Sequence, residues 1–278
     1  MFTTLISPPE LFTLQANVVI VDCRFSLADT NYGRKAYAAG HIPRAVYAHL
    51  DEDLSGPIIH GKTSRHPLPD VNDFSAKLSA WGVDNDTQVV AYDDAGGAIA
   101  ARLWWMLRWL GHDAVAVLNG GIQAWEANYP LSQGVPSVVP ATFTPRLRPE
   151  LLVNVETVAQ AHAETLLIDS RTPERYRGEA EPIDPIAGHI PGAVNAPHPT
   201  TIGDDGDYLS PTTLRAHFET LLGDTSPIQA VFYCGSGVTA ARNLLAMAYA
   251  GLGDGKLYAG SWSEWITDPS RPVATGNE

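Results

Sequence analysis

The sequence has little cysteine and no excess of basic residues, and each shortage excludes a class of protein. Its two cysteines, Cys23 and Cys234, stand far apart with no CxxC pair, which excludes a disulfide scaffold and a zinc knuckle. We therefore expect no metal site. The 18 Lys and Arg residues are outnumbered by 31 Asp and Glu, for a formal net charge of −13. This charge disfavours nucleic acid and anionic membranes as partners, although a local positive site could still bind a small anion.

Long apolar runs are also missing. The densest one, residues 98–110, is too short for a bilayer and is interrupted by Arg102 and Arg108. The start, "MFTTLISPPELF", has neither the basic residues nor the sustained apolar stretch of a signal peptide. Together with the two isolated cysteines, these features predict a protein of the reducing cytoplasm.

What the chain does contain is enough apolar sequence for substantial cores. It has 278 residues, of which 45% are hydrophobic and 18% charged, so a disordered chain is excluded. This length accommodates two ordinary domains or one large α/β domain.

An internal repeat indicates two domains and not one large domain. Four blocks of the first half recur in the same order in the second half, with slowly drifting offsets, which shared composition does not produce. The paired blocks are VVIVDCRF (18–25) with TLLIDSRT (165–172), GHIPRAV (40–46) with GHIPGAV (188–194), VVAYDDAGGAIAAR (89–102) with AVFYCGSGVTAAR (230–242), and LNGGIQAW (118–125) with YAGSWSEW (258–265). The chain is a tandem duplication.

Each copy alternates short apolar runs with helix-like patterns, which predicts an α/β fold. The apolar runs are typical of buried strands, and their alternation with helices predicts a mostly parallel sheet with helices on both faces. We predict an N-terminal domain over residues 1–128, a C-terminal domain over 150–278, and a Pro-rich linker over 129–149.

The segment after the third strand of the second copy is the strongest functional signal. Cys234 follows the apolar run 230–233 and precedes Gly235, Ser236, Gly237, Val238 and Thr239, after which a helix pattern begins. Ligands collect where parallel strands end, and the glycines allow successive backbone N–H groups to turn inward, toward an anion. The start of the helix adds the positive end of its dipole. These groups would lower the pKa of the thiol, so we expect Cys234 to be a nucleophile and Cys23 to be a buried structural residue.

The first copy provides an internal comparison. Asp93, with Asp94 beside it, stands where the second copy has Cys234. A carboxylate can neither accept sulfur nor attract an anion, so we expect the first domain to be catalytically inactive.

The repeat, the two GHIP blocks, the CGSGVT loop and "GSWSEW…DPSRPVATG" together resemble the two-domain rhodanese-type sulfurtransferases, over nearly the whole chain. The resemblance implies two rhodanese-like domains and a sulfur donor, 3-mercaptopyruvate or thiosulfate. The cysteine would carry the sulfur as a persulfide, bound by the loop residues 235–239, and pass it to cyanide or a thiol. It implies no cofactor.

The resemblance also implies roles for other residues. Arg175 matches an arginine that binds the anionic end of the donor, while the second arginine usual in the mercaptopyruvate branch, nine positions later, is here Asp184. This departure leaves the donor open, and Arg177 could compensate for it. Ser236 matches a serine proposed to assist protonation, and His41 a histidine proposed to act with that serine, with Asp29 a weaker candidate. However, His41 has a twin, His189, in the second GHIP block, and a histidine common to both copies indicates a structural role.

Two alternatives remain open from the sequence. A cysteine phosphatase requires a longer loop and an arginine six positions after the cysteine, where this chain has Ala240, so we regard that class as disfavoured. A non-catalytic rhodanese-like binding module is the other alternative, against which the intact Cys234 loop argues.

Overall fold

The computed structural model describes residues 1–14, 17–160 and 165–277. They form two compact units that do not follow the two halves of the sequence strictly. Unit 1 comprises residues 1–56, 68–148 and 202–208, and unit 2 comprises residues 57–67, 149–201 and 209–278. Residues 57–67 stand in the first half of the sequence but belong to unit 2, and residues 202–208 stand in the second half but belong to unit 1. Residues 129–148 belong to unit 1.

Each unit contains a five-stranded sheet whose paired strands are all parallel, which confirms the predicted α/β class. Unit 1 has the strand order β1-β5-β4-β2-β3 and unit 2 the order β6-β10-β9-β7-β8, so equivalent strands occupy equivalent places. The strands of unit 1 are β1 (Leu5–Ile6), β2 (Val18–Asp22), β3 (Val46–Tyr47), β4 (Gln88–Tyr92) and β5 (Val115–Leu118). Those of unit 2 are β6 (Leu152–Val153), β7 (Leu166–Asp169), β8 (Val194–Asn195), β9 (Ala230–Tyr233) and β10 (Lys256–Tyr258).

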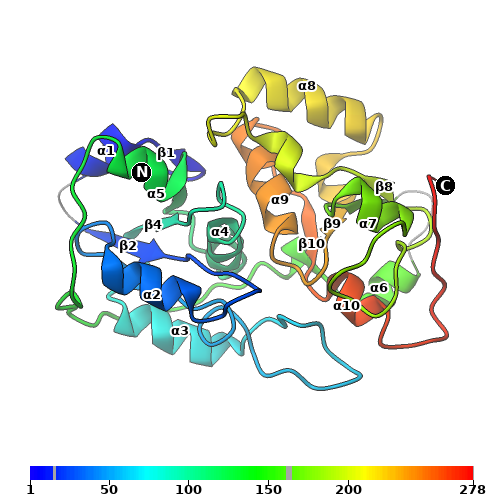
Figure 1. Cartoon of the computed structure of the whole chain (residues 1–278), viewed down its shortest axis with the longest axis horizontal. Coiled ribbons are helices and arrows are strands. Elements are labelled where there is room, and N and C mark those ends of the chain that lie inside the picture. Colours follow the sequence, from blue (N-terminus) through cyan, green and yellow to red (C-terminus); the bar gives the residue numbers. More distant parts are fainter. Residues whose placement is uncertain (15–16, 161–164, 278) are drawn as a thin grey trace. The chain divides into compact units, whose positions relative to one another are not determined.

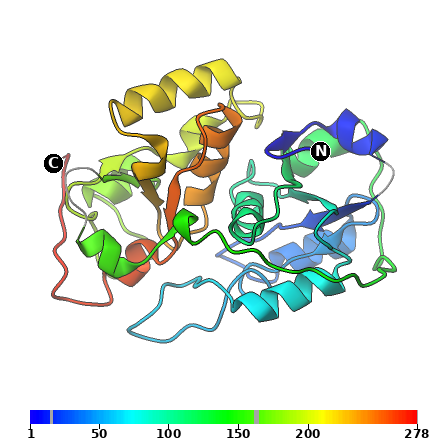
Figure 2. The ribbon, with the colours of Figure 1, turned by 180° about the vertical axis from the view of Figure 1, so that it is seen from behind.

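Helices cover the sheets. In unit 2, α8 packs on α9 and α9 packs on β9 and β10, while α6, α7 and α10 lie on the other side of these strands (Figures 1 and 2). The helices of unit 1 are α1 (Pro8–Thr13), α2 (Tyr32–Ala39), α3 (Val71–Ala80), α4 (Ala100–Trp109) and α5 (Gly121–Glu126). Those of unit 2 are α6 (Val155–Ala159), α7 (Pro173–Arg177), α8 (Pro211–Leu222), α9 (Ala240–Tyr249) and α10 (Ser261–Trp265), with 3-10 turns at Pro149–Leu151, His198–Thr201 and Pro227–Gln229. No helix among the described residues combines the length and apolar character needed to cross a bilayer.

A buried ion pair connects the end of one strand to the GHIP block in both units. In unit 2, Arg171 Nη2 lies 2.6 Å from Asp169 Oδ2 and donates to the carbonyl of Gly188, also at 2.6 Å. In unit 1, Arg24 makes the same contacts with Asp22 and with the carbonyl of Gly40. This pairing explains why both copies carry an Asp-x-Arg block, because an unpaired charge in either interior would be costly.

Candidate functional site

Cys234 lies between β9 and α9, at the carboxyl end of the parallel sheet of unit 2, and its side chain is buried with 2% exposed. Burial on its own raises the pKa of the thiol. Hydrogen bonds to the sulfur outweigh burial and hold the pKa below its ordinary value; their donors are the Thr239 side chain and the backbone N–H groups of Ser236, Ala240 and Gly237. The loop therefore favours a thiolate, which is the reactive form of cysteine.

The loop needs its second glycine. Gly237 has a φ of +73°, and a Cβ atom built on it would lie 2.2 Å from the carbonyl oxygen of Ala259. Any other residue would therefore displace the loop from the chain that leads to α10. The start of α10 completes this support, because the N–H of Trp262 donates to the carbonyl of Cys234 at 3.0 Å.

Ser236 has a histidine partner, and it is not the residue that we expected. His66 Nδ1 lies 2.7 Å from Ser236 Oγ, and both side chains are buried. His41 belongs to unit 1, where its Nδ1–H donates to the carbonyl of Tyr37 at 2.9 Å and its ring stacks on the Tyr37 ring. His66 is therefore the hydrogen-bond partner that the structure gives Ser236 within unit 2, and a role for His41 beside the serine stays a prediction.

The twin histidine makes the same contacts as His41. In unit 2, His189 donates to the carbonyl of Tyr176 at 2.8 Å and stacks on that ring, as His41 does on Tyr37. Both GHIP histidines thus share one structural role. His66 escaped the sequence analysis because residues 57–67 lie outside the four repeated blocks, although a lone Arg-His pair between prolines was a possible signal.

Asp29 is the weaker candidate. It is an exposed residue of unit 1 whose carboxylate accepts a hydrogen bond from Lys35 at 2.9 Å. This surface pair lowers the pKa of Asp29, first through the hydrogen bond from Lys35. Nothing in its surroundings suggests chemistry.

Arg175 reaches the cysteine loop, but it is paired with carboxylates. Its guanidinium contacts Glu181 at 2.7 Å and Asp184 at 3.1 Å, and its Nη1 and Nη2 atoms lie 3.6 Å from the position that a Cβ on Gly235 would occupy. Arg65 also pairs with Asp184. Asp184 is thus a shared counter-ion for two arginines next to the loop.

Arg177 does not replace the missing arginine. It forms an ion pair with Glu179 at 2.8 Å on the surface of unit 2, where both side chains are partly exposed. Cys23, in unit 1, is fully buried, and burial, followed by the nearby charge of Asp22, raises the pKa of its thiol well above the ordinary value. The geometry therefore agrees with a structural role for Cys23.

The equivalent loop of unit 1 is filled by its own side chain. The Asp93 carboxylate accepts four backbone N–H hydrogen bonds of 2.7–2.9 Å, from Ala95, Gly97, Ile99 and Ala100. These donors correspond to the groups that surround the sulfur of Cys234. The first copy has therefore kept the anion-binding backbone and occupies it with an internal carboxylate.

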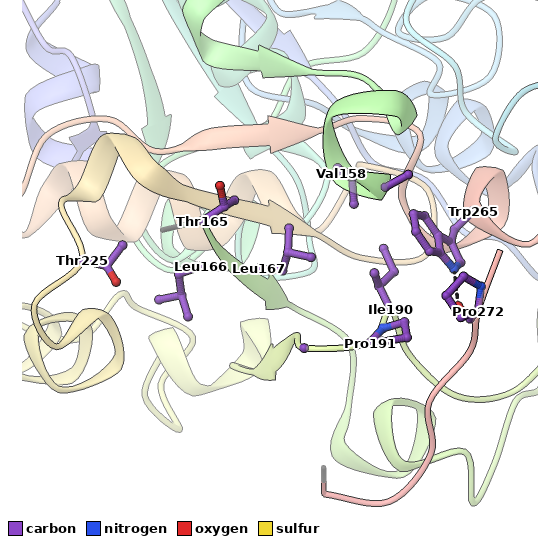
Figure 3. Close-up of a pocket in the computed structure, with 11 residues that line it drawn as sticks. Val158, Thr165, Leu166, Leu167, Ile190, Pro191, Thr225, Trp265 and Pro272 are labelled. Carbon is purple, nitrogen blue, oxygen red and sulfur yellow. Dashed lines mark hydrogen bonds between the residues drawn. The ribbon is translucent and has the colours of Figure 1, made fainter. Parts of the chain in front are cut away.

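A second hollow in unit 2 does not compete with this site. It lies beside the start of β7, and its lining contains no cysteine, histidine or charged residue (Figure 3). Trp265 Nε1 donates to the carbonyl of Pro272 at its edge. Within residues 1–14, 17–160 and 165–277, no group of three or more His, Cys, Asp and Glu residues is arranged to hold a metal ion.

Comparison with known proteins agrees with this fold. The profile of the family described as "Rhodanese-like domain" matches residues 10–128 and 154–268. The chain belongs to the rhodanese family. It is an enzyme of the sulfurtransferase class, since its named relatives favour a catalyst over a non-catalytic module.

Three relatives illustrate the range of names. A Pseudomonas aeruginosa protein named "Probable 3-mercaptopyruvate sulfurtransferase" is 49% identical over 95% of this chain and 94% of its own. Thiosulfate sulfurtransferase of Bos taurus is 35% identical over 89% of this chain and 84% of its own. The solved structure of 3-mercaptopyruvate sulfurtransferase from Leishmania major has a TM-score of 0.85 at 34% identity and covers 97% of this chain and 75% of that chain.

The Asp93 loop generates a stability prediction. Asp93→Ala removes the acceptor of four buried N–H groups, so we expect the free energy of unfolding to fall by about 3 kcal/mol. Urea denaturation of the full chain measures this change. Glu126→Ala, at an exposed position of α5, is the control and should change the value by less than about 0.5 kcal/mol. A loss below about 1 kcal/mol for Asp93→Ala would show that the carboxylate is not needed there.

Proposed function

We propose that Cys234 takes a sulfane sulfur from an anionic donor, holds it as a persulfide and passes it to cyanide or a thiol. The observation that carries this proposal is the ring of hydrogen-bond donors around the sulfur, which stabilises a negative charge there. The same donors suit a thiolate before transfer and a terminal persulfide anion after it. Gly235, Ser236, Gly237, Val238 and Thr239 provide the backbone of this binding loop.

The first half-reaction is a displacement at the outer sulfur of the donor. The Cys234 thiolate attacks that sulfur, a new S–S bond forms, and the bond from the transferred sulfur to the rest of the donor breaks with its electron pair. Thiosulfate releases sulfite, while 3-mercaptopyruvate releases the enolate of pyruvate, which then takes up a proton. In the second half-reaction, cyanide or a thiolate attacks the outer sulfur of the persulfide and restores the Cys234 thiolate.

The pair formed by Ser236 and His66 favours 3-mercaptopyruvate as the donor. An enolate leaving group needs a proton and sulfite does not, so a serine hydroxyl hydrogen-bonded to an imidazole is useful only for the former. The name of the Pseudomonas aeruginosa relative supports the same choice. Arg175 is the candidate for binding the carboxylate of this donor.

Other functions fit less well. A phosphoryl group would need a cation six residues after Cys234, where α9 begins with Ala240, and Arg242 instead faces His198 at 3.3 Å. The cytoplasmic location stays a prediction from the sequence.

The persulfide is tested by mass spectrometry. After treatment with 3-mercaptopyruvate and removal of excess donor, we expect the peptide that contains Cys234 to gain the mass of one sulfur atom, and cyanide to remove it. Cys23→Ser should behave as the unchanged chain does, and Cys234→Ser should gain nothing. Sulfur on Cys23, or on neither cysteine, would refute the proposal.

The choice of donor is tested by Ser236→Ala. Because only the enolate requires protonation, we expect kcat with 3-mercaptopyruvate to fall by about 100-fold and kcat with thiosulfate to change less than about threefold. Thiocyanate release from cyanide measures both rates, and Ser270→Ala on the surface is the control. Equal losses with the two donors would instead indicate that Ser236 only shapes the loop.

A further inference from the structure

A network of opposite charges lies next to the cysteine loop in unit 2. Arg175 contacts Glu181 and Asp184, and Arg65 contacts Asp184 through its Nη1 atom. Arg171 lies 3.2 Å from Glu181, in addition to its pair with Asp169. Three arginines thus face three carboxylates. Of these three carboxylates, Asp184 pairs with both Arg65 and Arg175.

Both of these arginines have guanidinium nitrogen atoms next to the cysteine loop. Among the described residues, Arg65 Nε is buried without a hydrogen-bond partner. Arg65 Nη2 lies 2.9 Å, and Arg175 Nη1 3.6 Å, from the position of a Cβ on Gly235, the residue after Cys234. A buried guanidinium donor without a partner is costly, so this arrangement indicates a site for an anion.

Arg65 provides the second cation that the sequence seemed to lack. The arginine expected at position 184 is replaced by Asp184, and the cation comes instead from residues 57–67, which belong to unit 2. This segment is anchored on α10, where the N–H of Arg65 donates to Ser263 Oγ at 3.2 Å. Position 184 thus carries a negative charge in this chain, and Arg65 places a positive charge beside it.

We propose that Arg65 and Arg175 together bind the anionic end of the sulfur donor, and that Asp184 between them sets the preference for a singly charged carboxylate over doubly charged thiosulfate. This inference rests on the proposed sulfur transfer and specifies how its donor is selected. Asp184 acts as a positioning residue: it holds both guanidiniums near the loop and offsets part of their charge.

The preference follows from the local charge. Burial raises the pKa of Asp184, while Arg65, Arg175 and Arg171 oppose that rise and Glu181 adds to it. When Asp184 is ionised, its negative charge repels an entering dianion about twice as strongly as a monoanion at the same place. A carboxylate donor can therefore use both arginines at a smaller electrostatic cost than thiosulfate.

Two variants test the proposal, each measured with both donors. Asp184→Asn keeps the shape and removes the charge, so we expect the ratio of kcat/KM for thiosulfate to that for 3-mercaptopyruvate to rise about tenfold. Arg65→Met removes one cation, so KM should rise about tenfold for both donors with kcat changed less than about threefold. Asp113→Asn, which changes the total charge equally but lies in a surface ion pair of unit 1, is the control.

Calorimetric binding of both donors to Cys234→Ser separates recognition from chemistry, because this variant cannot form the persulfide. In that background, Arg65→Met should weaken both donors and Asp184→Asn should favour thiosulfate, whether or not the unchanged chain transfers sulfur. If sulfur transfer occurs but the donor ratio and the KM values stay as in the Asp113→Asn control, the inference is wrong and the proposed function survives. If binding shifts as expected but no persulfide forms, the inference survives and the proposed function is wrong.

Discussion

The structure depends on one recurring constraint: backbone N–H groups between a parallel strand and a helix point inward and require an anion. In unit 1 the carboxylate of Asp93 accepts four of these hydrogen bonds, and in unit 2 the sulfur of Cys234 occupies the equivalent place. An aspartate satisfies the N–H groups permanently, whereas a thiolate satisfies them and remains reactive. One backbone arrangement therefore binds a carboxylate in one copy and the sulfur of a cysteine in the other.

The arginines around this loop are paired with carboxylates, so they give the loop no large excess of positive charge. The ion pair of Asp169 and Arg171 connects β7 to the second GHIP block, and Asp184 lies between Arg65 and Arg175. A site of this kind can receive an anion within a chain of net charge −13, because nearby guanidinium groups act on the anion at short range while salt screens the distant acidic surface. The cost is that an entering donor must compete with carboxylates already in place.

Much of this could be predicted from the sequence, because the evidence was local. The repeat predicted two α/β units, and the cysteine followed by glycines at a strand end predicted the loop. His66 and Arg65 were missed, because residues 57–67 stand between two segments of unit 1 in the sequence but fold with unit 2. From the sequence, Asp184 indicated only that an expected arginine was missing. The structure shows that Asp184 pairs with Arg65. The sequence already indicated a structural role for His41 through its twin, His189, and the two rings make the same backbone contact.

The central claim, that the loop holds Cys234 as a reactive anion, is tested most directly by titrating its thiolate through ultraviolet absorbance in the Cys23→Ser chain. The account predicts a pKa below the ordinary cysteine value of about 8.5, and no such transition when Cys234 is also replaced by serine. A pKa at or above the ordinary value would show that burial outweighs the hydrogen bonds of the loop, and it would contradict the claim.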